Sequence, residues 1–396
     1  MPYIQKRTKT SAISRIVTFI LLAAVLIALS FLAYLKSQGY EISNLTFQDI
    51  KAFYYAKTSN ADGGTLKNQI DYLQSDHPIF TVYKDYIVRC TADSIKYYSK
   101  DGTEVFTKNL ALKSPIIKTN GKELLLADTG SREVYVFKDK EVKWNYKMDA
   151  TIINADIDSD GHVAIVHDAK GYKSAVTVFN AQGGPFFTRN IAEGIAINAS
   201  VSPKGQHVAT TMLDTSGIDS TSQIEVTNIL GSPVGEKITG VQDLLYNILY
   251  MDSELAICIG NKAIVGVDGD NREKWRTTQE DYRIASAVKM DGRNALLVTV
   301  SNEKSLLLSD FKSKIIKVNT DGKLSEVYST NGYIKNISCN KGVIGINLGN
   351  EVTFVSSSGK KLGSYTPKTD VNQVNVLSSN EAAVITKTAV EIIKIN

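Results

Sequence analysis

The sequence contains little cysteine: three of its 396 residues, Cys90, Cys258 and Cys339, are cysteines. They stand far apart, in the segments VRCT, AICI and ISCN, whose composition is typical of β-strands. This spacing favours three small buried apolar side chains, and one disulfide with a leftover thiol is the alternative. Stability must then come from a large hydrophobic core, which a chain of this length can bury.

The motifs of several enzyme classes are also missing. After residue 35 the chain has no Gly-Lys-Ser/Thr phosphate loop, no G-x-S-x-G elbow and no C-x-x-C pair. These absences exclude the corresponding nucleotide, hydrolase and redox sites. Paired carboxylates for glycoside hydrolysis stay open, because two such groups meet only in space.

Long apolar runs are absent except for one, from Ile16 to Leu35, which has 20 residues and no charge. A helix of this length matches the roughly 30 Å hydrocarbon core of a bilayer. Four basic residues precede the run and only Lys36 follows closely, which predicts a cytoplasmic stub at 1–15 and a signal anchor at 16–35. A signal peptide cleaved near Ala28-Leu29-Ser30 is the alternative.

The chain has no net charge beyond residues 1–35, which contain the predicted anchor. The whole chain has 45 Lys plus Arg against 41 Asp plus Glu, and residues 1–35 contain four basic and no acidic residues. The remaining residues are therefore balanced, so the basic character belongs to the membrane segment. Nucleic acid is not an expected partner.

From residue 77 the chain also lacks any helix-length apolar pattern and instead shows short runs rich in Val, Ile, Thr and Tyr between turn residues. Residues 36–76 form a predicted linker, with a short amphipathic helix at 45–57. Residues 77–396 predict an all-β domain outside the cytoplasm, built from units of four strands, which is the arrangement of a β-propeller.

Two recurring turns give the number of units. The first hairpin of a unit recurs eight times, at residues 84–85, 120–121, 160–161, 204–205, 252–253, 291–292, 341–342 and 379–380. The third hairpin recurs seven times, at residues 101–102, 139–140, 182–183, 230–231, 268–269, 321–322 and 358–359. We therefore predict eight blades, with seven as the alternative. The last blade lacks an outer strand, and residues 66–74 are placed to supply it and close the ring.

Two tryptophans and two glycines mark equivalent positions in different units. Trp144 and Trp275 end the fourth strands FKDKEVKW and VDGDNREKW in one register, while Gly161 and Gly205 mark first hairpins, the latter in VSPKGQHVA. These units resemble the quinoprotein-like propeller repeat, whose Trp packs on the neighbouring blade. The whole layout is similar to an uncharacterised family of Gram-positive membrane proteins. The resemblance implies the fold and no activity, and no residue matches a quinone-binding position.

The most specific local motif is Asp156-Ile157-Asp158-Ser159-Asp160-Gly161, whose alternating carboxylates fit a Ca²⁺ site. The motif is incomplete. An EF-hand would need Glu at position 167, which is His, and the calcium hairpins of integrin-like propellers would need Asp at position 164, which is Ala. A plain Asp-Gly hairpin is the other interpretation. His162 and His167 are five apart on one strand and point to opposite faces, so they do not share a metal.

The 19 tyrosines include the pairs at 83–86 and 97–98, which suggest either a binding surface or half-buried strand positions. The leading hypothesis is a membrane-tethered propeller that binds a protein or an envelope component through loops on one face, without catalysis. The alternative is a hydrolase of envelope glycans with carboxylates in the channel. A sensor acting through a membrane partner is a third hypothesis.

Overall fold

The computed structural model describes residues 12–37, 64–290, 295–302 and 312–395. It divides into two compact units, Met1–Ser59 and Asn60–Asn396. The predicted helix at 45–57 and the sixth first-hairpin turn at 291–292 lie outside the described residues.

The first unit contains helix α1 (Ala12–Ser37), which includes the predicted anchor. Its segment Val17–Tyr34 is long and apolar enough to cross a membrane, a property that a signal sequence shares. Its large apolar side chains, among them Phe19, Leu22 and Ile27, are exposed. Such a helix needs an apolar medium or a partner to cover it.

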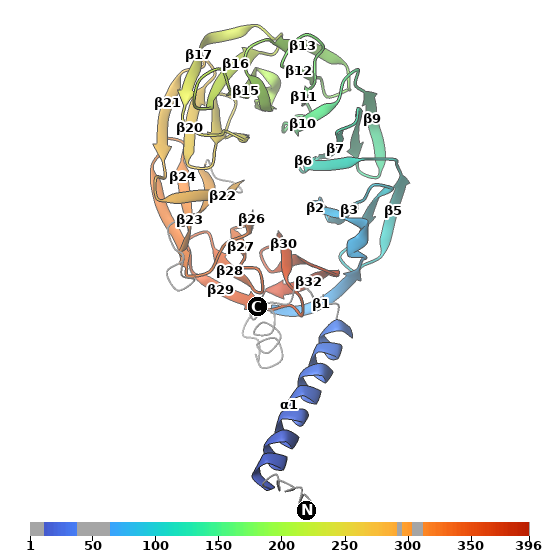
Figure 1. Ribbon diagram of the computed structural model, residues 1–396. Coiled ribbons are helices and arrows are strands. Elements are labelled where there is room, and N and C mark those ends of the chain that lie inside the picture. Colours follow the sequence, from blue (N-terminus) through green and yellow to red (C-terminus); the bar gives the residue numbers. More distant parts are fainter. Residues whose placement is uncertain (1–11, 38–63, 291–294, 303–311, 396) are drawn as a thin grey trace, which may run out of the picture. The chain divides into compact units, whose positions relative to one another are not determined.

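The second unit is a ring of eight four-stranded antiparallel sheets (Figure 1). The prediction of eight blades is confirmed, and the alternative of seven is wrong. Blades 1 to 4 contain these strands in order from the channel outward: β2 (Ile79–Tyr83), β3 (Tyr86–Cys90), β4 (Ser94–Tyr98), β5 (Glu104–Asn109); β6 (Ser114–Thr119), β7 (Glu123–Thr129), β8 (Glu133–Lys138), β9 (Glu141–Lys147); β10 (Ile152–Ile157), β11 (Val163–His167), β12 (Ser174–Phe179), β13 (Pro185–Ile191); β14 (Ile195–Val201), β15 (His207–Asp214), β16 (Thr221–Asn228), β17 (Pro233–Val241).

Blades 5 to 8 follow the same order, and the last takes its outer strand from the start of the domain. Their strands are β18 (Asn247–Tyr250), β19 (Leu255–Ile259), β20 (Ala263–Asp268), β21 (Glu273–Thr278); β22 (Tyr282–Lys289), β23 (Ala295–Asn302), β24 (Ser313–Asn319), β25 (Leu324–Thr330); β26 (Asn336–Asn340), β27 (Val343–Asn347), β28 (Val352–Ser356), β29 (Lys361–Tyr365); β30 (Val371–Ser378), β31 (Glu381–Thr386), β32 (Ala389–Ile395), β1 (Gly64–Asp71).

The ring is closed by β1, which pairs antiparallel with β32 from Gly64 opposite Ile395 to Asp71 opposite Ala389. This strand covers much of the segment at 66–74 for which the hairpin count predicts a closing strand. Ile70 is buried against both the first and the last blade. Closure therefore uses backbone pairing within blade 8 and side-chain packing between blades 8 and 1.

The hydrophobic core is divided among the blade interfaces. Each of the eight clusters of buried side chains combines residues from two neighbouring blades, as Leu125 of blade 2 and Ile165 of blade 3 show. A sheet packs both of its faces this way, so a blade depends on two neighbours. None of the three cysteines, all of them described residues, forms a disulfide, and burial raises the pKa of the Cys90 and Cys258 thiols to about 12. The alternative with a disulfide is excluded.

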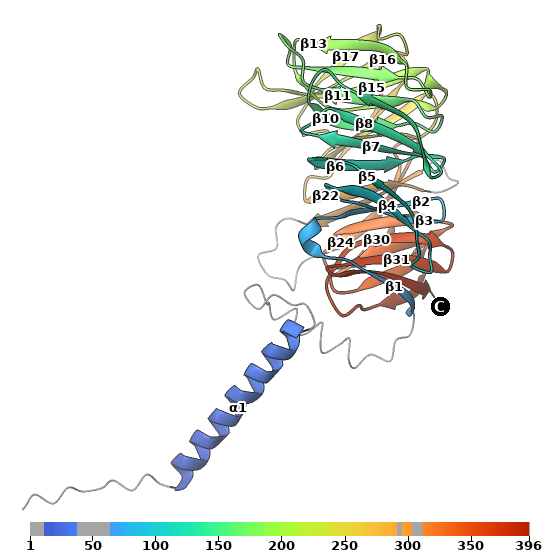
Figure 2. The same ribbon diagram turned by 90° about the vertical axis from the view of Figure 1, so that its right-hand side faces the viewer.

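The two ends of the ring differ in their connections, as Figure 2 shows from the side. One end, which we call the turn face, carries the tight turns between the first and second and between the third and fourth strands of a blade. The other end, the loop face, carries the second-to-third loops and the links between blades. Gly64 and Ile395 both lie at the turn face, because β1 runs from there to the loop face.

Candidate functional site

The central channel contains a cavity of about 550 Å³ at its turn-face end. The inner strands of six consecutive blades line it. Side chains that face it include Thr81, Lys118, Asp156, Ser200, Asn247 and Lys289. Its size is within the range of small-molecule sites.

Inner strands expose one backbone edge to the channel, and asparagine side chains cover part of it. Asn120 donates from Nδ2 to the Asp158 carbonyl oxygen in the first turn of the next blade. Asn154 and Asn198 donate from Nδ2 to a carbonyl oxygen of the next blade's inner strand or of the link that enters it. The distances are 2.6, 3.1 and 3.3 Å. Asn340 repeats the contact between blades 7 and 8, at 3.1 Å to the Val376 oxygen. These bonds satisfy edge groups and tie neighbouring blades together.

The three aspartates of the predicted calcium motif have separate partners. Asp156 accepts from Lys118 Nζ at 3.1 Å and from Ser200 Oγ at 2.5 Å. Asp158 Oδ1 accepts from the backbone of its own turn, while Asp160 Oδ2 accepts from the Lys204 backbone nitrogen at 2.8 Å. Among the described residues no cluster of three or more His, Cys, Asp or Glu side chains is arranged for a metal. The calcium site stays a prediction, and these contacts favour the hairpin interpretation.

His162 and His167 have different roles in blade 3. His162 Nδ1 lies 2.8 Å from Asp158 Oδ2, whereas the buried His167 ring lies between the Asp168 carbonyl oxygen at 2.7 Å and Thr177 Oγ1 at 2.8 Å. The hydrogen bond to Asp158 raises the pKa of His162 above its ordinary value. The two rings do not approach a common point, which agrees with their spacing along the strand.

Stability should therefore fall as the pH rises past the ordinary His pKa of about 6.5. Because the pKa of His162 is raised in the folded state, the protonated ring stabilises the fold. This stabilisation is complete below the ordinary His pKa and is lost as the pH rises through the pKa of the folded state. We expect urea unfolding to give about 1 kcal/mol more stability at pH 6 than at pH 8.5 from this contact. His162→Gln should remove this contribution of about 1 kcal/mol to the stability difference between pH 6 and pH 8.5. His207→Gln is the matched control and should keep it. An equal pH dependence of stability in the two variants would contradict the role of the His162–Asp158 contact.

The repeat markers form contacts between blades. The Trp144 ring packs directly on Gly183: a Cβ atom added to this glycine would be 2.7 Å from the ring. Trp275 packs on Gly322 at the same distance. Both glycines are in third-hairpin turns of the next blade, with φ of +86° and +79°. Phe187 occupies this place against Gly231. At these three interfaces the aromatic side chain of the fourth strand therefore packs where a glycine of the following blade leaves room.

The first-hairpin markers pack in a similar way at the turn face. A Cβ on Gly161 would be 2.5 Å from Glu123 Oε2, and one on Gly205 would be 2.8 Å from His162 Cε1. The first turns of blades 2, 3 and 4 thus contact each other in succession, and Gly161 and Gly205 each make room for a side chain of the preceding blade.

The clustered tyrosines are mainly core residues. Tyr83 and Tyr97 are fully buried in the interface of blades 1 and 2, and the Tyr83 hydroxyl donates to the Lys122 carbonyl oxygen at 2.7 Å. The interpretation of these pairs as a binding surface is therefore wrong. Outside α1, Tyr172 and Tyr333 are the exposed tyrosines of the described residues, and both belong to the loop face.

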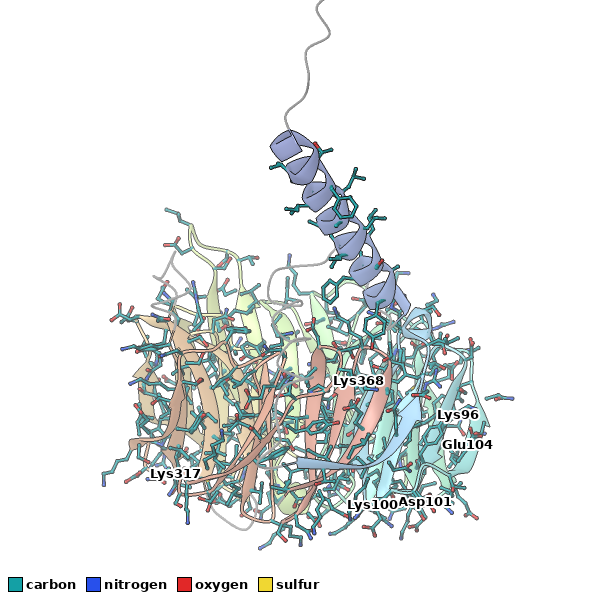
Figure 3. The ribbon with its side chains drawn as sticks, turned by 90° about the horizontal axis from the view of Figure 1, so that it is seen from below. Lys96, Lys100, Asp101, Glu104, Lys317 and Lys368 are labelled. Atoms are coloured by element: carbon teal, nitrogen blue, oxygen red, sulfur yellow. The ribbon has the colours of Figure 1, made fainter. Side chains whose placement is uncertain are left out.

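The loop face also carries exposed aliphatic side chains that the sequence analysis did not single out. They are Leu73, Ile218 and Leu244. Ile218 is fully exposed in the loop between β15 and β16, which projects from the ring in Figure 2. The outer surface is different in character: Figure 3 shows Lys96 and Glu104 on blade 1, which form an ion pair at 2.8 Å, with Lys100 and Asp101 at the turn beyond them.

Comparison with known sequences then gives the family. Residues 58–395 match the family of unknown function DUF5711. The chain belongs to this family. No curated protein matches the sequence significantly. The match covers the closing strand as well as every blade, so the DUF5711 unit is the whole closed ring.

Solved structures show the same fold at low sequence identity. The DUF5711 chain is similar to BamB from Moraxella catarrhalis, with a TM-score of 0.52, 11% identity, and 84% of this chain and 97% of that chain covered. It is also similar to Sqt1 from Chaetomium thermophilum, solved bound to the N-terminus of a ribosomal protein, with a TM-score of 0.56, 10% identity, and coverage of 83% and 99%. These similarities show the propeller fold and leave activity open.

Proposed function

We propose that this DUF5711 chain is a membrane-tethered propeller outside the cytoplasm that binds a protein or an envelope component through its loop face. In this proposal residues 1–15 are cytoplasmic and 16–35 cross the membrane. Residues 36–76 connect and supply the closing strand β1, and 77–396 form the rest of the binding domain. The basic residues before the apolar run support this orientation. The quinoprotein-like origin of the repeats and a Gram-positive source belong to the same proposal.

The observation that carries the proposal is the set of large apolar side chains held out on loops of one face. Ile218 is fully exposed, and Leu73, Tyr172, Leu244 and Tyr333 join it on the loop face. Apolar groups on projecting loops gain free energy when a partner removes them from water, at roughly 25 cal/mol per Å². A rigid ring that presents such loops is suited to recognition.

The charge of the surrounding loops indicates what partner fits. The loop-face loops of blades 3 to 5, with the links that enter and leave these blades, carry seven acidic and three basic residues: Asp149, Asp168, Glu193, Asp219, Asp243, Glu280, Asp281, Lys170, Lys173 and Lys262. A partner segment with basic and apolar side chains would complement them. Sqt1, a propeller of similar fold, was solved with a terminal segment of another protein bound.

Crosslinking on intact cells tests this function. A membrane-impermeant crosslinker should attach the full chain to a reproducible partner, because the proposal puts the ring outside the cytoplasm. The double substitution Ile218→Ser and Leu244→Ser should reduce the crosslinked yield about tenfold, the effect of losing roughly 1.4 kcal/mol of binding.

Leu230→Ser is the matched control, because Leu230 is 73% exposed but lies at the turn face. It should leave the crosslinked yield unchanged. Equal yields from the loop-face variant and the wild type, or no reproducible partner at all, would overturn the proposed function.

A further inference from the structure

We propose that the channel cavity at the turn face is a binding site for a small ligand with a carboxylate group, and that Lys289 is its anchor. This goes beyond the proposed function, because the site lies at the other end of the ring from the exposed apolar loops. It is argued from the hydrogen-bonding capacity and charge of the side chains that line the cavity.

The Lys289 ammonium group is held in place but has capacity left. Its Nζ donates to the carbonyl oxygens of Tyr250 at 3.0 Å and Met251 at 2.8 Å, both at the end of blade 5's inner strand. An ammonium group has three donors, so one remains. Within the described residues Lys289 forms no ion pair, and its side chain is open to the channel. The cavity therefore contains a fixed cation without a bound carboxylate.

The other charged groups of the cavity already have polar partners. Lys118 is 3.1 Å from Asp156, and that carboxylate accepts a second hydrogen bond from Ser200. Asp158 is paired with His162 and with backbone nitrogens. Lys289 is thus the ammonium group of the described lining that has no carboxylate partner there. Desolvation lowers the pKa of Lys289, although nearby Asp252 acts in the opposite direction.

The cavity has unused hydrogen-bond donors. The Thr81 hydroxyl and the Asn247 amide nitrogen form no intramolecular hydrogen bond within the described residues, and both line the same cavity. The carboxylate oxygens of Asp156 and Asp158 are occupied. A ligand that fits must bring acceptors, and a negative charge improves its hydrogen bonds.

The charge balance distinguishes a carboxylate from a phosphate. One free ammonium group matches a single negative charge, whereas a dianion would leave one charge uncompensated near Asp156 and Asp252. The cavity also has apolar walls, from Ile157, Val201 and Leu249, which suit the carbon skeleton of a small acid. The geometry points to a monocarboxylate with hydroxyl groups, such as a sugar acid.

Calorimetric titration of the full chain in detergent tests the site with three probes: glucuronate, inorganic phosphate and glucose. Glucuronate should bind with a Kd of about 1 mM or tighter, and phosphate and glucose at least about tenfold more weakly. Lys289→Met should weaken glucuronate binding at least about tenfold. Lys204→Met, which removes the same charge from an exposed turn at the same end of the ring, should change it less than about twofold.

A second measurement uses the wild-type chain alone. Saturating glucuronate should raise the pKa of Lys289, followed by NMR of its ¹⁵Nζ and ¹³Cε nuclei, because a bound carboxylate favours the charged ammonium. Phosphate binding tighter than glucuronate, equal losses in the two lysine variants, or an unchanged Lys289 pKa would each overturn the proposal. These outcomes are independent of the crosslinking result at the loop face.

Discussion

Replacing Ile70 with aspartate is expected to lower the free energy of unfolding by about 4 kcal/mol or more. Ile70 is 8% exposed and belongs to the cluster that joins blade 8 to blade 1, with Phe80, Ile87 and Ile392. A carboxylate there would lose apolar packing and would be buried without a partner. Since β1 closes the ring, the substitution weakens the interface between blades 8 and 1. No chain segment other than β1 and its link to β2 connects these two blades directly.

Leu66→Asp is the matched control for this prediction. Leu66 lies on the same strand but is 45% exposed, so the same substitution should cost less than about 1 kcal/mol. Urea unfolding of the full chain in detergent, followed by the fluorescence of Trp144 and Trp275, measures both variants. Both tryptophans are in other blades, so a shift of their transition would show that loss of closure destabilises the ring as a whole. Equal midpoints for Ile70→Asp and the wild type would refute the role of β1.

The second large effect is expected from Gly322→Ala. The added Cβ would be 2.7 Å from the Trp275 ring, and the backbone there has a φ of +79°. The ring has little freedom to move away, because Trp275 Nε1 donates to the Thr320 carbonyl oxygen at 2.8 Å. We expect a loss of about 3 kcal/mol, from about 1 to 2 for the left-handed backbone and a similar amount for overpacking.

Gly342→Ala separates the two contributions. Gly342 has a φ of +77°, but nothing lies within 4 Å of its Cβ position, so this variant should lose only the backbone part. Trp275→Leu combined with Gly322→Ala should be less destabilised than the sum of the single changes, by about 1 kcal/mol or more. Additive free energies of unfolding in the double variant would argue against the Trp–Gly contact between blades.

Much of the ring could be predicted because its turns require particular residues. Gly102, Gly121 and Gly231 have positive φ, a conformation that favours glycine, and so the hairpins are visible in the sequence. The signal is incomplete where other residues adopt this conformation. Lys84 and Lys341 do so in first hairpins, and in the third hairpin of blade 5 it is Asn271 rather than Gly269 that has a positive φ.

The candidate sites were less predictable, because their residues meet only when blades close into a ring. Lys289 and Thr81 line one cavity although about 200 residues separate them, and neither belongs to a recognisable motif. Conversely, the D-x-D-x-D motif is conspicuous in sequence, yet its aspartates bond to Lys118, His162 and Lys204 on different elements. The tyrosine content did not predict a binding surface, for a similar reason: whether a tyrosine is buried depends on whether its side chain faces the neighbouring blade.

The direction of β1 determines how this protein would respond to mechanical force. The strand begins at the turn face, and the chain that precedes it is attached there, while the exposed apolar loops are at the opposite end. A pull applied through Gly64 against a ring held by those loops acts along the axis of β1. All hydrogen bonds between β1 and β32 would then share the load in shear, instead of breaking one after another as in a strand peeled from its side. In the proposed function, a ring closed in this orientation would resist opening while a partner at the loop face is pulled.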